Sequence, residues 1–323
     1  MTNPISNNAA SEMLVSFRRR YPPWVASDAS LLYHYTTAVG LKGIIDEGAI
    51  HASDAEFLND ARELEFGREE LYEALMAEAE HIAPEEELSL SGGAEYSRVT
   101  VMRSAASHLR PGGRFLRRQA HSAYVTCFCE VGDLLSQWRG YAEGAGYAIG
   151  FRRSALQAID PTPTTMRVIG QDGGIAAHVD GPPLETLLVQ VRYGSDAIVP
   201  AVQQVLGTIA SHPVGHPGAT GWAQAQRVLL PTLASLKDAA FQEEREWRLI
   251  TVGSEGLEAV QFRVGALGLV PYIPMQLPPD SIAEIVIGPG ANADLRKHGV
   301  IRFLSTRRGG NVSVHHSTAP YRG

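Results

Sequence analysis

Short apolar runs and polar helical patterns follow one another irregularly along this chain. Apolar runs of strand length predict strands at 31–36, 50–53, 123–129, 146–151, 186–192, 247–252, 260–264, 269–273, 282–287 and 312–315. Apolar residues at helical spacing, and polar stretches bounded by Pro or Gly, predict helices at 11–20, 39–47, 61–82, 96–109, 197–210, 222–241 and 291–298. Strands and helices out of strict alternation are typical of α+β proteins rather than of doubly wound sheets. The pattern therefore predicts an α+β fold.

Three features refine these expected elements. Pro84 is expected to end the long acidic helix, because proline cannot donate the backbone hydrogen bond that a helix interior needs. The stretch 161–183 is rich in Pro, Gly and Asp and is expected to form a long irregular excursion. Asp133 is expected to cap a short helix that runs through Trp138.

Length and composition set the class of protein. The 323 residues are enough for one large or two ordinary domains, and 44% apolar with 20% charged residues is ordinary for a soluble globular protein. We expect an N-terminal helical segment at 1–30 and a single α+β domain at 31–323, with a helical insertion at about 61–121. The net charge of −7 argues against a general nucleic-acid coat protein, which would be basic.

Cysteine use and the N-terminus indicate the compartment. Cys127 and Cys129 fall on one face of a strand, too close for an ordinary disulfide, so neither a disulfide framework nor a cysteine zinc site is expected. The N-terminus lacks a basic-then-apolar signal peptide, and no apolar run approaches the roughly 18 residues that a membrane span needs. We expect a cytoplasmic protein with no membrane partner. No metal-ligand spacing, phosphate-binding loop or dinucleotide glycine motif is found, so no metal is expected.

His34 lies inside the first apolar strand, with Thr36 on the same face. Burying an ionisable ring is costly unless it is paired or used. One interpretation is a core histidine that bonds to backbone, and the other is a donor that holds a polar ligand at the strand end. Downstream, Asn59 and Asp60 precede Glu63 at a helix start, where they either cap the helix or hold a ligand anion or hydroxyl.

Two further clusters carry candidate chemistry. Trp138, Arg139 and Tyr141 lie close together before a glycine pair, and they either form core or clamp an aromatic ring or a phosphate. Glu244 and Glu246 bracket Arg245 at the start of a strand. They form either a solvated charge network or a carboxylate site that holds a sugar hydroxyl and stabilises a developing oxocarbenium charge.

Taken in order, these motifs resemble a widespread bacterial family of uncharacterised domains. The motifs are Leu-Tyr-His-Tyr-Thr at 32–36, Leu-Asn-Asp at 58–60, Cys-Phe-Cys at 127–129, Trp138 with Tyr141, and Glu-Arg-Glu-Trp-Arg-Leu at 244–249. That family is in turn similar to the ADP-ribosyltransferase superfamily. The resemblance implies an ADP-ribosyltransferase-like split, mixed β-sheet core with helical insertions.

The resemblance also implies residue roles. His34 would help to hold NAD. The local chemistry described above adds Thr36, Asn59, Trp138 and Arg139 as further candidate binding residues. Tyr141 and Tyr147 compete for the middle aromatic position. Glu246 would engage the ribose as the catalytic carboxylate, and Glu244 would precede it as the other member of a Glu-x-Glu pair. NAD would be consumed as a substrate rather than kept as a bound cofactor.

We therefore expect an NAD-consuming transferase or glycohydrolase that acts on an unidentified macromolecular or small-molecule acceptor. A toxin or defence effector with a neutralising partner is the role that we expect for such an enzyme. The alternatives are an RNA 2′-phosphotransferase on the same fold and a non-catalytic module that binds a nucleotide or a partner. On the leading hypothesis, His34 and Glu246 lie on adjacent strands and face one cleft, which Trp138 or Tyr141 borders.

Overall fold

The structure is a computed structural model of the whole chain. It describes residues 28–58, 61–89, 121–142, 146–170, 173–194, 229–254, 257–265, 267–307 and 311–320, together with positions 99, 102–103, 106, 109, 197, 200–201, 203 and 205. The predictions for residues 1–27, and for Asn59 and Asp60, lie outside this described part of the chain.

The largest element is a ten-stranded mixed sheet, which confirms the expected α+β class. Its strands are β1 (Leu31–Thr36), β2 (Ala49–Asp54), β3 (His121–Cys129), β4 (Tyr147–Arg152), β7 (Thr186–Gln190), β10 (Glu246–Ser254), β11 (Gln261–Gly265), β12 (Gly268–Gln276), β13 (Ile282–Ile287) and β14 (Ser313–His316). Only the β13–β14 pair in this sheet is parallel among the described strands. Two small sheets join β5 (Thr162–Ile169) to β6 (Ile175–Leu184) and β8 (Arg192–Tyr193) to β9 (Leu236–Lys237).

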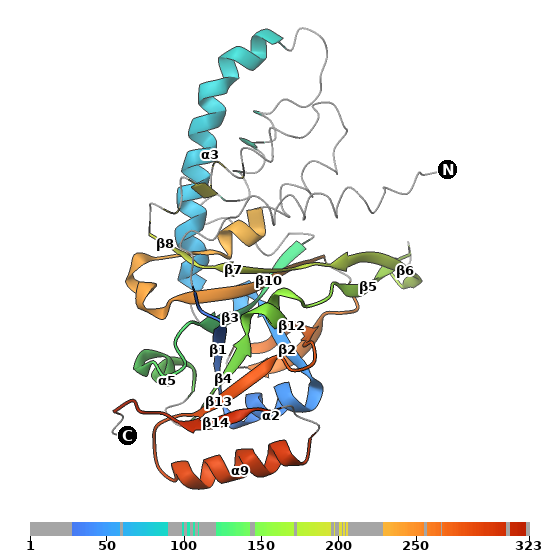
Figure 1. Cartoon of the computed structure of the whole chain (residues 1–323). Helices are drawn as coiled ribbons and strands as arrows, with labels where there is room; N and C mark the ends of the chain where they lie inside the picture. The colour runs from blue at the N-terminus through green and yellow to red at the C-terminus, as the bar shows by residue number, and fades with distance from the viewer. Residues whose placement is uncertain are drawn as a thin grey trace.

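The sheet forks along β3. One edge of β3 pairs with β10 over its whole length, from Glu246 opposite Cys129 to Ser254 opposite His121. The other edge is shared: β1 pairs with it at Cys129, and β2 pairs with it at Val125 and Tyr124. One branch then continues through β1, β4, β13 and β14, and the other through β2, β12 and β11. Figure 1 shows the two branches below the β10–β7 edge.

Apolar side chains pack on both faces of the β3–β10 pair, as the two-residue alternation of strands requires. On one face, Val125 and Ile250 pack with Leu71 and Leu75 of the long helix α3 (Ala61–Ser89), in a first core cluster. On the other face, Phe128, Trp247 and Leu249 belong to a second cluster. A third cluster gathers Tyr35, Cys129, Trp138, Ala142, Ala148 and Val286.

The helices lie around this sheet. The helix α2 (Ala38–Glu47) connects β1 to β2, begins at Thr37, whose side chain accepts a hydrogen bond from the Gly40 amide, and ends at Gly48 in the left-handed region. The helix α3 extends away from the sheet, and α9 (Ala293–Ser305) lies at the opposite end of the molecule, beyond β13 and β14 (Figure 1). Two shorter helices, α5 (Leu135–Tyr141) and α6 (Arg153–Gln157), flank β4 in the chain.

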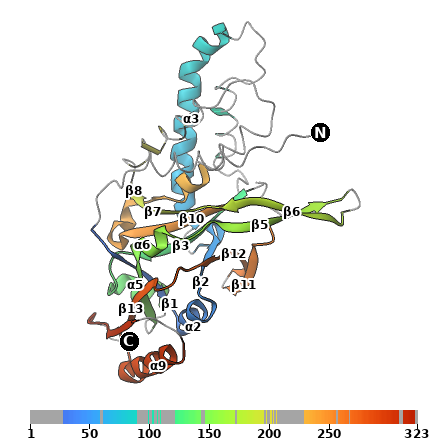
Figure 2. The same cartoon turned by 45° about the vertical axis from the view of Figure 1, so that its right-hand side comes forward.

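Three expected elements are wrong. The helix α3 continues through Pro84 to Ser89, where a proline that removes one hydrogen bond is tolerated within a glutamate-rich helical stretch. The stretch 161–183 is largely the β5–β6 hairpin, which projects from the molecule (Figure 2). The helix expected through Phe241 ends earlier, because Leu236 and Lys237 form β9 and pair in parallel with β8.

No helix within the described part of the chain is long and apolar enough to span a membrane. Among the same residues, no three His, Cys, Asp or Glu side chains are placed to hold a metal ion together.

Candidate functional site

Four charged side chains meet at the end of β3 where β10 begins. Arg248 donates from Nε to Glu246 Oε1 at 2.7 Å and from a terminal nitrogen to Glu246 Oε2 at 3.0 Å. The ammonium of Lys237 donates to Glu246 Oε2 at 3.1 Å and to Glu244 Oε2 at 2.7 Å. A further guanidinium nitrogen of Arg248 donates to the Ala234 carbonyl. We refer to Lys237, Glu244, Glu246 and Arg248 as the charged cluster.

Burial differs sharply between the members of the charged cluster. The side chains of Lys237 and Arg248 are each 2% exposed and that of Glu246 is 6% exposed, whereas Glu244 is 14% exposed. Burial alone would raise the pKa of the Glu246 carboxyl, but Arg248 and then Lys237 outweigh it and hold that pKa at about 2. Glu246 is therefore a compensated, buried anion, and Glu244 is the carboxylate that the cluster presents toward its surface.

The local sequence explains why both glutamates reach one ammonium. The 3-10 helix η4 (Ala239–Glu244) begins at Asp238, whose carboxylate accepts a hydrogen bond from the Ala240 amide. It ends at Arg245, which has a φ of 43° in the left-handed region that non-glycine residues seldom adopt. This turn leads directly into β10, so Glu244 and Glu246 lie on either side of one strained residue.

Aromatic rings surround the charged cluster. Tyr141, the last residue of α5, is 38% exposed, and burial and then the charge of Glu244 raise the pKa of its phenol. The Tyr193 hydroxyl accepts a hydrogen bond from the Glu246 amide at 2.8 Å. The ammonium of Lys237 also lies 4.6 Å from the centre of the Phe241 ring, a cation–π contact. Trp138, in the same helix as Tyr141, shares the third core cluster with Cys129, which lies opposite Glu246, so the end of α5 lies near the Glu-x-Glu pair.

Trp138 and Arg139 do not share this position. Trp138 is fully buried, and its indole nitrogen donates to Asp133 at 2.8 Å. The expected capping role of Asp133 is wrong, because α5 starts after Leu134 without a side-chain cap. Arg139 is exposed on α5. Of the expected pair, Tyr141 and not Trp138 borders the candidate site.

The expected placement of His34 is wrong in two respects. The strands β1 and β10 are not adjacent, because β3 lies between them and pairs with both. The ring of His34 contacts Phe128 of the second cluster, with 5.9 Å between ring centres, whereas Glu246 lies on the opposite face with the charged cluster. By strand alternation, Tyr33 and Tyr35 are the β1 residues that point toward the Glu246 face.

His34 instead fills the fork of the sheet. Its Nδ1 donates to the carbonyl of Cys127 at 2.9 Å, at the point where β1 has diverged from β3. Burial lowers the pKa of the His34 ring. The hydrogen bond to the Cys127 carbonyl is the next largest influence and opposes this shift. This geometry matches the interpretation of His34 as a core histidine bonded to backbone.

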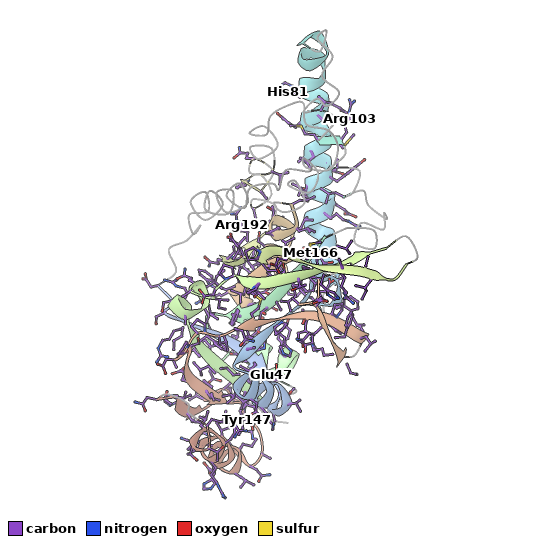
Figure 3. The ribbon with its side chains drawn as sticks, turned by 90° about the vertical axis from the view of Figure 1, so that its right-hand side faces the viewer. Glu47, His81, Arg103, Tyr147, Met166 and Arg192 are labelled. Carbon is purple, nitrogen blue, oxygen red and sulfur yellow. The ribbon has the colours of Figure 1, made fainter. Side chains whose placement is uncertain are left out.

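The remaining expected binding residues are spread out. Thr36 is the last residue of β1 and lies opposite Tyr147. Tyr147 is buried in the second cluster, and Figure 3 shows it toward the α9 end of the molecule, whereas Arg192, the neighbour of Tyr193, lies toward α3. Of the two tyrosines that compete for the middle aromatic position, Tyr141 is thus the candidate on the side of the Glu-x-Glu pair. Asn59 lies outside the described residues.

Lys237, Tyr193 and Cys127 were not predicted as site residues. The sequence predicted that Lys237 lies in a helix over 222–241, whereas it lies in the strand β9. Because of this error, its position beside Glu246 was not predicted. Cys127 lies opposite Arg248, and burial and then Glu246 raise the pKa of its thiol. Arg248 follows Glu246 by two positions within an otherwise apolar strand. An arginine at such a position is the feature of the sequence that could have indicated a charge network.

Residues 137–249 match the model of a family described as a protein of unknown function, DUF2971. The matched segment begins in α5 and ends in β10, so it contains Tyr141 and all four members of the charged cluster. This similarity agrees with the expected resemblance to an uncharacterised domain family. No curated protein matches the chain.

Proposed function

We propose that the protein is an ADP-ribosyltransferase-like enzyme that binds NAD and breaks its nicotinamide–ribose bond. One observation carries the proposal: α5, which ends at Tyr141, shares the third core cluster with Cys129, and Cys129 lies opposite Glu246 at the end of the β3–β10 pair. Tyr141 and Glu246 belong to the middle and late motifs of the resemblance. The forked sheet also supports the split-sheet fold that the resemblance implies.

In this proposal Glu244 takes the role first expected of Glu246. When the nicotinamide–ribose bond breaks, its electron pair leaves with the nicotinamide nitrogen and positive charge develops on the ribose. A carboxylate beside the ribose stabilises that charge, and because nicotinamide departs neutral, no strong general acid is needed. Glu246 is less suited, because Arg248 and Lys237 already compensate its buried charge.

Tyr141 supplies the other half of the proposed site. Its ring is partly exposed at the end of α5, which suits an aromatic surface that packs against the nicotinamide or its ribose. Lys237 then fixes the Glu244 carboxylate without touching the substrate. Transfer to a macromolecule and hydrolysis by water share this first step and differ only in the acceptor.

The decisive experiment measures nicotinamide release from NAD by the full chain. We expect release by the wild type and a loss of about a hundredfold or more in Glu244→Gln, the usual effect of removing one positioned charge from a transition state. Glu243→Gln is the matched control, because Glu243 is an exposed neighbour that makes no contact in the cluster as described. Full activity in Glu244→Gln, measured at a temperature at which all three proteins are folded, overturns the role of Glu244.

A non-catalytic binding module is the second candidate, and one observation favours it. Glu246, the carboxylate that the resemblance makes catalytic, is buried and neutralised by two cations. Calorimetric binding of NAD without release of nicotinamide would support this module. RNA 2′-phosphotransfer and a toxin or defence role stay predictions.

A further inference from the structure

The first-strand motif contacts α5 through Tyr35. The hydroxyl of Tyr35 accepts a hydrogen bond from the Leu134 amide at 2.9 Å and donates to the Val131 carbonyl at 2.8 Å. Its ring packs edge-to-face on Trp138, with 4.7 Å between ring centres. Tyr35 therefore holds both the loop before α5 and the buried tryptophan within it.

Asp133 holds the same helix from a second side. Its carboxylate accepts hydrogen bonds from the Trp138 indole at 2.8 Å, from the Ser317 hydroxyl, and from the amide and hydroxyl of Thr318 at 2.6 and 2.9 Å. Ser317 in turn donates its amide to the Ile287 carbonyl of β13. Asp133 therefore connects α5 to the segment that follows β14.

The helix α5 depends on such contacts for its position. It has seven residues and no side-chain N-cap, and a helix this short is not stable in isolation. Its buried residues Gln137 and Trp138 fix one side, and Trp138 shares the third core cluster with Cys129, which lies opposite Glu246 of the charged cluster. A small shift of α5 would therefore move Tyr141 relative to Glu244.

We propose that Tyr35 and Asp133 are positioning residues that fix α5 and thereby set Tyr141 against the charged cluster. This inference rests on the proposed function for its effect on NAD. It assigns a role to the second tyrosine of the Leu-Tyr-His-Tyr-Thr motif, in the strand where His34 and Thr36 were expected to serve the site. The C-terminal segment at 317–318 completes the arrangement through Asp133.

The test compares Tyr35→Phe with Tyr33→Phe. Both variants remove one phenol oxygen from β1, but the Tyr33 hydroxyl donates to Glu284 on β13 rather than to the loop before α5. In Tyr35→Phe we expect amide hydrogen exchange in α5 to become about tenfold faster, since two backbone groups lose a partner. Exchange in α5 should stay unchanged in Tyr33→Phe. Asp133→Asn should accelerate the same amides.

A second measurement separates positioning from general stability. With Tyr141 present, Tyr35→Phe should lower kcat/KM for nicotinamide release about tenfold, mainly through KM, because a misplaced ring weakens ground-state binding. In a Tyr141→Ala background, Tyr35→Phe should lower kcat/KM no further, because both changes remove one function.

Unchanged α5 exchange in Tyr35→Phe, or additive losses in the double variant, overturns the positioning role. A wild-type chain that releases no nicotinamide overturns the proposed function instead. The exchange comparison between Tyr35→Phe and Tyr33→Phe then still decides whether Tyr35 fixes α5.

Discussion

Lys237 and Glu246 form a buried ion pair, with 3.1 Å between Nζ and Oε2, although they come from different strands. The same ammonium holds Glu244 at 2.7 Å. A buried charge is tolerated only when it is paired, so the four-member cluster has to be built as a unit. Substitutions in the charged cluster should therefore distinguish the residues that stabilise the fold from the residue that contacts a ligand.

Glu246→Gln should destabilise the fold. The variant removes the anion between Arg248 and Lys237 and leaves two buried cations with weaker partners. Breaking a buried pair in this way costs about 3–5 kcal/mol. Urea denaturation measures the loss, and Glu243→Gln, at an exposed neighbouring position, should stay within about 0.5 kcal/mol of wild type. Equal stability of the two variants would contradict a structural role for Glu246.

Acid should weaken the wild-type fold through the same carboxylate. Glu246 has a pKa of about 2 in the fold against an ordinary value of 4.5, so its stabilisation is present above pH 4.5 and is lost as pH falls toward 2. The difference corresponds to about 3 kcal/mol. Denaturation curves between pH 6 and 2 should show the gap between wild type and Glu246→Gln narrowing over that window. A difference in unfolding free energy that stays constant with pH would show that protonation of Glu246 does not weaken the fold.

Lys237→Met and Glu244→Gln should be coupled. Each substitution alone removes one side of an ion pair with 2.7 Å between Nζ and Oε2, and the double variant removes both sides together. A double-mutant cycle on the free energy of unfolding should give a coupling of about 1–3 kcal/mol. Strict additivity would mean that the two side chains do not interact in solution.

Gly288→Ala should destabilise the region around α5. A Cβ at this position would lie 2.8 Å from the Gly146 carbonyl oxygen and 2.9 Å from the Trp138 ring, which is closer than such atoms approach. Overpacking of this kind costs about 1–3 kcal/mol. Gly299→Ala in α9, where no atom lies within 4 Å of the added Cβ, is the control and should be neutral or stabilising. The melting temperature should fall in Gly288→Ala and stay the same or rise in Gly299→Ala.

His34→Phe should reduce stability without changing NAD affinity. The variant keeps a ring against Phe128 but leaves the Cys127 carbonyl without its donor at the fork of the sheet. An unpaired buried group costs about 1–3 kcal/mol. Calorimetric titration with NAD and urea denaturation measure the two effects separately. A large loss of NAD affinity at unchanged stability would instead show that His34 is a ligand-binding residue.

Most strands were predictable because they form short continuous apolar runs, as strands that are buried on both faces do. The strands β1, β3, β10 and β13 lie within about a residue or two of their expected bounds. The β5–β6 hairpin was not predictable in this way, because its outer residues are exposed and its Pro and Gly content is typical of loops.

The candidate site was predicted in part, and its arrangement was not predicted. Glu244 and Glu246 were named from local chemistry, and the structure joins them through Lys237, which was not named. The face to which His34 belongs depends on which strands pair with β3, a long-range fact that local pattern does not contain. Lys237 was missed for a similar reason, since two-residue strands leave almost no pattern.

The shared strand β3 also constrains how the chain can fold during synthesis. Its full-length partner β10 belongs to the second half of the chain, and so do β12 and β13, which pair with β2 and β4 of the first half. Neither branch of the fork can be completed until these later strands have left the ribosome. Contacts so distant in sequence form slowly, and the emerging first half carries unpaired strand edges in the meantime. A chain truncated before β10 would therefore be expected to aggregate rather than to form a smaller stable fold.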